Sequence, residues 1–215
     1  MFKHKVAWRS PINCVLLLIV ALGAFGNGLY IHAKARLAQY LIADAWQQSL
    51  IDGRMTKPWS WADTWPVARL RNSRLNQDLF VLAGASGSSL AFGPGHLDGS
   101  ALPGQKGSML VGGHRDTHFN FLKTLHRGDR LRVQGISGSW FTYQVNEILI
   151  RDSRVEPLFA SSGQSELLLV TCYPFDAVVP GGPLRYVVQA RLLVEQGNDI
   201  QIETRLASSH LNSDI

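Results

Sequence analysis

The chain has 215 residues, of which 46% are hydrophobic and 17% charged, and its formal net charge is +5. This composition is typical of a folded protein and excludes a largely disordered one. The length leaves room for one globular domain and an anchor rather than two domains. The lysines and arginines are scattered along the sequence, with no basic stripe interleaved with aromatic residues, so we expect no nucleic-acid partner.

The N-terminal segment predicts a membrane-spanning helix. A basic head within residues 3–9 precedes an apolar run, Cys14 to Ile31, whose only strongly polar residue is Asn27. That length lies at the lower end of the range that crosses a hydrocarbon core of about 30 Å. A cleaved signal would have a shorter apolar part and a small-residue cleavage site, which Ala33–Ala35 matches poorly because it contains a lysine. We favour an uncleaved anchor over a cleaved signal, with the domain outside the cytoplasm.

The segment after the apolar run predicts that the helix continues from Ala33 to about Leu50, because apolar residues recur there every three to four positions. We expect it to stop at Asp52-Gly53 and to pack its apolar stripe on the domain. A connector from Lys57 to Pro66 follows, with three tryptophans and two prolines. We expect these tryptophans to pack on the flank of the domain; a place at the membrane interface or in a ligand site stays open.

Beyond the connector the pattern changes to short β segments separated by turns that contain glycine or proline, such as Gly93-Pro94-Gly95. Asn120 to Leu125 alone predicts a short helix there. Many short strands with almost no helix between them predict a closed or nearly closed barrel, which leaves few exposed edges. The expected fold class is all-β, an eight-stranded barrel with short helices after an N-terminal transmembrane helix. The expected strands are Ala68–Arg71, Leu79–Ala83, Ser88–Phe92, Ser108–Gly112, Arg130–Gln134, Ser139–Ile150, Glu166–Cys172 and Leu184–Val194.

The two cysteines bear on function. Cys14 lies in the apolar run and cannot reach the domain, so Cys172 has no intramolecular disulfide partner. An unpaired thiol in an exported domain is typical of a reactive cysteine. Most free cysteines, however, are small buried apolar residues. The cysteine count alone therefore leaves both interpretations open.

Two strand ends carry polar chemistry. At one, Gly112-Gly113 is followed by a polar cluster that begins with His114; at the other, the continuous apolar run Leu167–Val170 leads to Cys172. A nucleophile at a strand end is held by a rigid element while its side chain reaches a groove. In the last strand the even positions are apolar, so the period of two turns Arg185 away from the core. A groove on the outer wall could collect the thiol, the imidazole and the guanidinium.

These residues resemble the sortase family, and most closely the single-copy sortases of marine Gram-negative proteobacteria. The resemblance covers roughly Ala33 to Glu195. One position departs from the commoner family signature, since Leu168 stands where a threonine usually precedes the cysteine by four residues. The stretches that carry the resemblance are Trp61–Leu70, Gly93–His96, Gly113–Phe119, Val170–Cys172 and Arg185.

The resemblance implies a membrane-anchored cysteine transpeptidase without cofactor or metal. Cys172 would attack a backbone carbonyl in the C-terminal sorting signal of a target protein, and an amine of unknown identity, or water, would release the thioacyl intermediate. His114 would transfer protons and Arg185 would stabilise the oxyanion. Asp116 could orient the histidine, and Thr171 could shape the substrate groove. The family also points to the loop from residue 151 to 165 as a determinant of specificity.

The expected organisation has four parts. Residues 1–32 would form a cytoplasmic tip and the transmembrane anchor, and residues 33–66 a juxtamembrane helix with the connector. Residues 67–195 would form the catalytic barrel, and residues 196–215 a polar tail. The catalytic domain would lie on the periplasmic side of the inner membrane, held there by a single pass.

Three other interpretations stay open. A different Cys/His hydrolase or a cell-wall transpeptidase is one, although the cell-wall enzymes usually have glycine where Tyr173 follows the cysteine. A metal site made of His114, Asp116, His118 and Cys172 is another, although this histidine spacing suits a helix and the paired glycines disfavour one. A membrane-tethered β-barrel that binds a partner without catalysis is the third.

Overall fold

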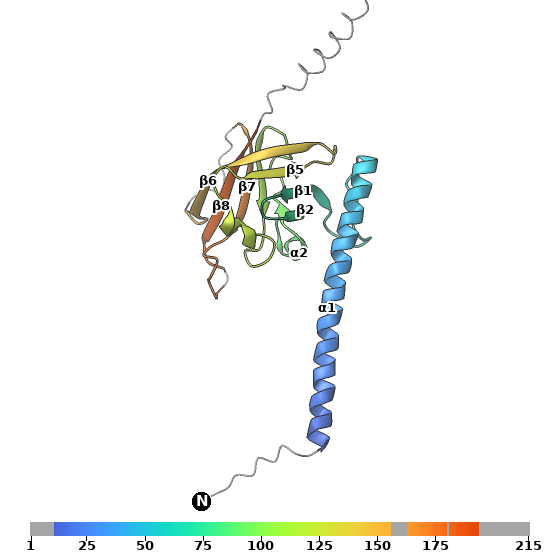
Figure 1. Cartoon of the computed structure of the whole chain (residues 1–215). Coiled ribbons are helices and arrows are strands. Elements are labelled where there is room, and N and C mark those ends of the chain that lie inside the picture. Colours follow the sequence, from blue (N-terminus) through green and yellow to red (C-terminus); the bar gives the residue numbers. More distant parts are fainter. Residues whose placement is uncertain (1–10, 156–162, 180, 194–215) are drawn as a thin grey trace, which may run out of the picture.

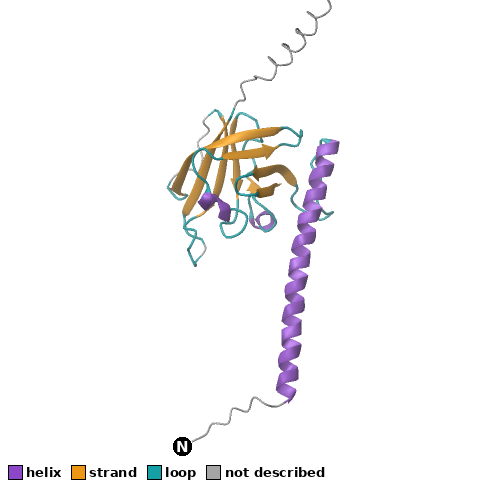
Figure 2. Ribbon diagram, viewed as in Figure 1, coloured by secondary structure: helices purple, strands orange, loops and turns teal. Residues whose placement is uncertain are grey.

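The structure is a computed structural model that describes residues 11–155, 163–179 and 181–193. A long helix runs beside a β-barrel and extends well past it at the N-terminal end (Figures 1 and 2). The basic head, part of the loop from 151 to 165, and the expected tail lie outside the described residues.

Helix α1 (Pro11–Asp52) is continuous through the apolar run and the expected juxtamembrane helix. Its apolar N-terminal part is long enough to cross a membrane and makes no buried contact with the rest of the described chain. The helix ends where the sequence predicts, because Gly53 adopts a φ of +67° and donates its N–H to Ser49 O at 3.0 Å. A left-handed glycine after the last turn is a common way to satisfy a terminal carbonyl. The expected apolar helix is confirmed, and it is consistent with either an anchor or a signal.

The C-terminal part of α1 packs on the barrel with one face. The buried positions recur at helical spacing: Ala38, Ile42, Ala45, Trp46 and Ser49. Trp46 is fully buried, and its ring centroid lies 6.5 Å from that of Phe80 on the barrel. A helix that buries one stripe derives most of its stability from that packing. The expected packing of this segment on the domain is confirmed.

Eight strands form a closed barrel in the order β1-β2-β3-β4-β7-β8-β6-β5. The pairs β2–β3 and β4–β7 are parallel and the others are antiparallel. A short helix α2 (Gly87–Leu90) and a 3-10 helix η1 (Asn120–Thr124) lie in the connections. The strands are β1 (Pro66–Asn72), β2 (Gln77–Ala83), β3 (Gly95–His96), β4 (Gly107–Gly112), β5 (Arg130–Gln134), β6 (Trp140–Asp152), β7 (Ser165–Cys172) and β8 (Leu184–Leu192).

The strands bury apolar residues on both faces near β7. Leu167 and Leu169 point into the main core inside the barrel. Their neighbours Leu168 and Val170 lie in a second apolar cluster with Leu110 of β4 and Val187 of β8. Successive side chains of a strand point to opposite faces, so this second cluster lies on the outer face. The continuous apolar run of β7 is explained by this double burial, which fixes the register of β4, β7 and β8.

The eight-stranded barrel is confirmed, but one expected strand is wrong. Ser88–Phe92 falls in α2 and the turn after it, where Ser89 Oγ donates to Gly84 O at 2.8 Å. The eighth strand is instead β3, which the sequence predicted to be part of a turn. A Cβ atom on Gly95 would come within 2.2 Å of Gly84 O, so glycine permits the close backbone approach of β3 to the chain after β2.

The tryptophans of the connector divide between two environments. Trp59 is half-buried with its ring centroid 5.3 Å from that of Phe92, and Trp65 packs against the main core. Trp61 is 84% exposed. The expected packing on the barrel is therefore confirmed for Trp59 and Trp65 and is wrong for Trp61.

Candidate functional site

Cys172 and Arg185 face each other across two neighbouring strands. Cys172 is the last residue of β7, and its register partner on β8 is Arg185. The adjacent hydrogen bond, Tyr173 N to Leu184 O at 3.0 Å, identifies them as a non-hydrogen-bonded pair. Such pairs have Cα atoms about 4.5 Å apart and side chains on the same face. The thiol and the guanidinium therefore share one face of the sheet, and both residues are half-buried.

That face is the outer wall of the barrel. Cys172 has the same parity on β7 as Leu168 and Val170 of the outer apolar cluster, and Arg185 has the same parity on β8 as Val187. Tyr186, Val188 and Ala190 belong to or pack against the main core. The prediction that the alternation of β8 turns Arg185 away from the core is confirmed. The outer face of β8 is not polar throughout, because Val187 is buried there in the outer apolar cluster.

His114 lies directly after the point where β4 leaves β7. The parallel ladder pairs Gly112 with Val170, and the next amide, Gly113 N, donates to Val170 O at 3.1 Å. His114 follows at once and is exposed. Its carbonyl accepts from Phe119 N at 3.0 Å, which closes a short loop of residues 114–119. The structure therefore brings the three predicted residues to the same end of neighbouring strands β4, β7 and β8.

A second histidine lies within electrostatic range of His114. Burial lowers the pKa of His118 below its ordinary value of 6.5, and the positive charge of His114 lowers the pKa further. Two imidazolium groups in one loop repel each other, so a proton on one disfavours a proton on the other. From the sequence, His118 was a candidate metal ligand and part of the Gly113–Phe119 stretch. The loop geometry instead makes it an electrostatic neighbour of His114.

Asp116 and Thr171 differ in exposure and in their hydrogen-bond partners. Asp116 is exposed and accepts a hydrogen bond from Arg115 Nε at 3.2 Å. Thr171 is buried, and its hydroxyl donates to Gly113 O at 2.7 Å. Thr171 thus links β7, one residue before the cysteine, to the chain one residue before the histidine.

Arg115 was not singled out by the sequence. It is only 8% exposed, and its guanidinium donates to the carbonyls of Pro174 and Ala177. These acceptors lie in the segment that follows Cys172. Nothing in the local pattern distinguishes Arg115 from an exposed arginine, because its partners lie about sixty positions away in the sequence and meet it only in the fold.

Arg185 is anchored at the other end of the same segment. One terminal nitrogen donates to Gly182 O at 2.5 Å and to Leu184 O at 3.0 Å. The positive charge of Arg185 also contributes to the low pKa of Asp152, which is about 2 chiefly because of hydrogen bonds from Arg154. These contacts direct the guanidinium toward the connection between β7 and β8.

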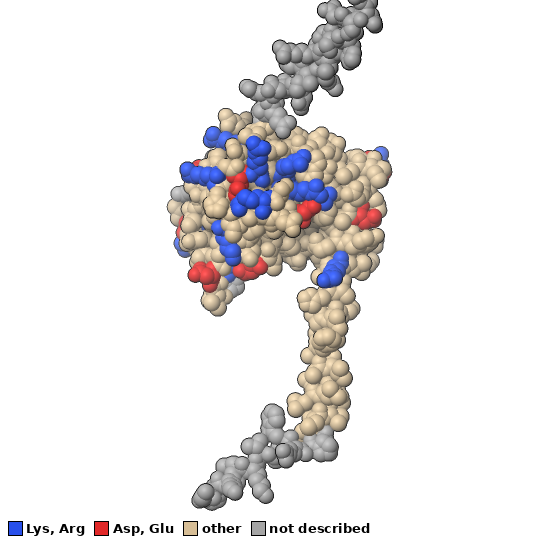
Figure 3. Space-filling model, in the orientation of Figure 1, with Lys and Arg blue, Asp and Glu red and all other residues tan. Residues whose placement is uncertain are grey.

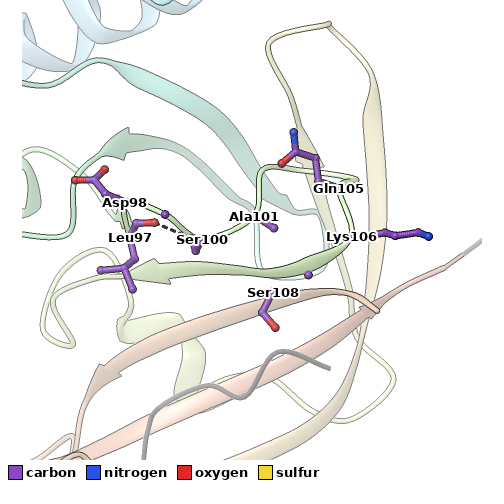
Figure 4. A pocket seen from close by; sticks show the side chains of 9 residues that line it. Leu97, Asp98, Ser100, Ala101, Gln105, Lys106 and Ser108 are labelled. Atoms are coloured by element: carbon purple, nitrogen blue, oxygen red, sulfur yellow. Dashed lines mark hydrogen bonds between the residues drawn. The ribbon is translucent and has the colours of Figure 1, made fainter. Parts of the chain in front are cut away.

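A pocket of about 450 Å³ lies at the N-terminal end of β4. It is lined by the loop from Leu97 to Ala101 and by residues 105–108 (Figure 4). Ser100 organises this loop, because its hydroxyl donates to Leu97 O and accepts from Leu110 N. In Figure 4 the side chain of Lys106 points away from the pocket, whereas Ser108 points toward the strands that follow β4.

The arginines are not scattered in the folded chain. Arg69 and Arg71 alternate along β1, Arg130 and Arg132 alternate along β5, and Arg71 is paired with Arg132 in the β1–β5 register. The guanidinium groups of Arg71 and Arg132 lie over the ring of Trp140, with their Cζ atoms 5.2 Å and 4.9 Å from the ring centroid. Lys and Arg side chains gather over this part of the barrel in Figure 3. Basic residues that are scattered along the sequence are thus gathered in part by the fold; the expectation of no nucleic-acid partner stays a prediction.

The metal-site interpretation gains no support from the geometry. Among the residues that the structure describes, no three histidine, cysteine, aspartate or glutamate side chains are grouped closely enough to hold a metal ion. His114, Asp116, His118 and Cys172 are therefore not arranged as a ligand set in this structure.

Comparisons with known proteins identify the family of this chain. A family model described as "Sortase domain" matches residues 70–193. The chain is 33% identical over 119 residues to Sortase D of Bacillus subtilis (strain 168), a match that covers 55% of this chain and 59% of that protein. The match thus spans less than two thirds of the length of this curated relative.

Solved structures share the barrel. Sortase A from Corynebacterium diphtheriae superimposes with a TM-score of 0.56 at 26% identity, covering 66% of each chain. Sortase C1 of Streptococcus agalactiae gives a TM-score of 0.53 at 27% identity, over 60% of this chain and 69% of that one. A Sortase D5 transpeptidase of Clostridium perfringens shares the fold with a TM-score of 0.55 at 21% identity, over 67% and 85%. Because the family model covers more than half of its residues, the chain belongs to the sortase family.

Proposed function

We propose that this protein is a membrane-anchored cysteine transpeptidase with Cys172 as its nucleophile. The observation that carries the proposal is the cross-strand pair of Cys172 and Arg185 on the outer face, at the strand end beside which His114 leaves β4. Family membership supports a sorting-signal substrate in general terms. The pairing supports the roles of the individual residues.

In the first half of the reaction the thiolate of Cys172 attacks a backbone carbonyl of the sorting signal. The sulfur–carbon bond forms, the peptide C–N bond breaks, and His114 gives a proton to the departing amine. The nucleophilic form of a cysteine is its thiolate. Arg185 on the facing strand places a permanent cation on the same face of the sheet as this sulfur.

In the second half an amine attacks the thioester, transfers a proton to His114 and releases Cys172. Water in place of the amine gives hydrolysis. General acid–base catalysis of this kind contributes about 10²- to 10⁴-fold. Arg185 cannot act as a base because a guanidinium group stays protonated in proteins. Its role is to stabilise the oxyanion of the tetrahedral intermediates.

The substrate lies along the outer face of β4 in this proposal. The parallel register pairs Gly107 of β4 with Ser165 of β7, and Cys172 lies seven residues beyond Ser165, an advance of about 23 Å. The pocket at the start of β4 is thus separated from the level of Cys172 by the length of about seven extended residues. Such spacing suits an extended signal whose scissile bond reaches the thiol. We further propose that the loop from residue 151 to 165 contributes to specificity, although its middle lies outside the described residues.

We also propose the finer assignments that the sequence predicts. These assignments are the division of the chain at residues 32, 66 and 195, the uncleaved anchor, and the placement of the domain on the periplasmic side of an inner membrane. The exposed apolar half of α1 and the basic head support them. The affinity to sortases of marine Gram-negative proteobacteria rests on the sequence motifs alone.

The proposal is tested with peptides that carry the C-terminal sorting signals of proteins encoded beside the gene. The full chain in detergent should cleave a cognate peptide and join it to an added amine, and Cys172→Ala, His114→Ala and Arg185→Ala should each abolish cleavage while the barrel stays folded. Cys14→Ala is the matched control, because that thiol lies in α1, and it should retain activity. Turnover by Cys172→Ala would contradict the mechanism.

A further inference from the structure

Arg115 is a buried charge that the reaction described above does not use. Its side chain is 8% exposed, and it lies next to His114 in the loop that leaves β4. Burying a charged group is costly unless it is paired and hydrogen-bonded. The site therefore has to provide partners for this guanidinium, and those partners show what the residue connects.

The partners lie on both sides of the active site. The terminal nitrogens Nη1 and Nη2 donate to the carbonyl oxygens of Pro174 and Ala177, and Nε donates to Asp116 Oδ1 at 3.2 Å. Pro174 and Ala177 belong to the segment that starts directly after Cys172. Arg115 thus joins the residue after the histidine to the segment after the cysteine, and we call this contact the Arg115 link.

A second contact joins the same two segments on their other side. Thr171 is 2% exposed, and its hydroxyl donates to Gly113 O at 2.7 Å. We call this contact the Thr171 link. Gly113 directly precedes His114, and Thr171 directly precedes Cys172. The two links therefore enclose the histidine between Gly113 and Arg115, and the cysteine between Thr171 and the segment after it.

We propose that Arg115 is a positioning residue that, together with Thr171, fixes the separation of His114 and Cys172. The inference rests on the proposed function of these two residues. Backbone pairing between β4 and β7 ends with the bond from Gly113 N to Val170 O, so this pairing does not hold the chain from His114 onward. The Thr171 link fixes the start of the histidine loop at Gly113. The Arg115 link fixes the same loop to the segment that follows Cys172.

The chemistry of the link requires a guanidinium. Two carbonyls three residues apart in the chain accept from two different nitrogens of one planar group. Arginine presents such donors in a rigid fork, whereas lysine is a single flexible ammonium group. Arg115→Lys should therefore keep the charge but lose the fixed geometry, and a misplacement of about 1 Å can cost about 10²-fold in rate.

Kinetics of the full chain with a cognate sorting-signal peptide test the proposal. We expect Arg115→Lys to lower kcat by about 10²-fold with KM within about twofold of wild type, because binding along β4 does not use the link. The matched control is Arg74→Lys. Arg74 also donates to a backbone carbonyl, Thr124 O, and to a carboxylate, Asp129, but it lies in the turn between β1 and β2. Its kcat should stay within about twofold.

Chemical rescue separates positioning from general loss of structure. Free guanidinium ion at millimolar concentration should restore part of the kcat of Arg115→Ala by occupying the vacated site, and it should restore nothing in Cys172→Ala. If Arg115→Ala does not fold, Thr171→Val takes its place and should lower kcat in the same way by removing the other link.

The outcomes are distinguishable. A wild-type chain that turns over none of the peptides and forms no adduct at Cys172 overturns the proposed function and the inference with it. An active wild type with unchanged kcat in Arg115→Lys overturns the inference alone. An equal loss in Arg115→Lys and Arg74→Lys, or a loss confined to KM, also overturns it, because either result assigns Arg115 a role other than positioning.

Discussion

Replacing Gly113 with alanine adds a single methyl group to the residue before His114 and perturbs the packing there. A Cβ atom at this position would lie 2.7, 2.8 and 3.0 Å from three ring atoms of Phe119. Phe119 is fully buried in the main core, so its ring has no space into which it can move. Overpacking of a well-filled core typically costs about 1 to 3 kcal/mol. The adjacent glycine offers a matched control, because a Cβ on Gly112 would meet only Ala85 Cβ at 3.8 Å.

Urea denaturation of the full chain in detergent measures the difference. We expect Gly113→Ala to lower the unfolding free energy by about 1 to 3 kcal/mol, and Gly112→Ala by no more than about 1 kcal/mol. With a urea slope of about 2 kcal/mol per molar, the midpoint should fall by about 0.5 to 1.5 M for Gly113→Ala. Peptide cleavage should fall as well, because the loop that carries His114 must shift to admit the methyl group. Equal stability of the two variants would refute the claim that the Phe119 ring determines the need for glycine at position 113.

Three further predictions follow from the contacts. Arg185→Lys should lower kcat by about 10²- to 10³-fold in the cleavage assay, since loss of one oxyanion donor costs that much, and near-normal kcat would contradict its assigned role. His118→Gln should flatten the pH dependence of the unfolding free energy below about pH 7. The pKa of His118 is lowered in the folded state, so the unfolded chain binds the proton more readily. The unfolding free energy of the wild type therefore falls as the pH drops through the folded pKa. Denaturation curves at pH 5 to 8 check this, and parallel curves for the two proteins would exclude it. Trp46→Ala should destabilise the full chain by about 3 to 5 kcal/mol, whereas Tyr40→Ala, at an exposed position of α1, should change it little; equal effects would show that α1 does not pack through this face.

The regular elements could be predicted from the sequence because their patterns are long. Strand β7 is a continuous apolar run, which predicted that Cys172 lies at a strand end. Strand β8 alternates between apolar and polar positions, which predicted that Arg185 lies on the outer face. The continuous helix α1 could likewise be predicted from its apolar run and from the apolar stripe that follows it. Each of these signals extends over several residues of one element, so the period of the side chains decides the structure.

The elements that were missed are too short to have a period. Strand β3 has only Gly95 and His96, and its place depends on the close approach of Gly95 to the backbone of Gly84. Helix α2 has four residues, and Ser89 stabilises it by side-chain contacts to carbonyls of Gly84 and Ser86. No repeat of 2 or 3.6 residues can be recognised over so few positions.

The candidate site shows the same limit. Cys172 and His114 could be named because each lies at the end of a recognisable strand pattern, and Arg185 because the alternation within β8 turns it outward. Arg115 could not be named, because its carbonyl acceptors are provided by a distant segment. The gathering of arginines on β1 and β5 was also missed, although the sequence carries a signal for it. Arg-Leu-Arg occurs at residues 69–71 and again at 130–132, and alternation in two paired strands places all four guanidinium groups on one surface.

The most direct test of the account is the intact mass of the protein after it is mixed with a cognate sorting-signal peptide and quenched in acid. We expect an added mass equal to the N-terminal cleavage fragment less one water, located on Cys172 by peptide mapping and removed by hydroxylamine, as a thioester requires. Cys14→Ala should form the same adduct. Cleavage of the peptide without any adduct on Cys172, or an adduct that persists in Cys172→Ala, would contradict the account.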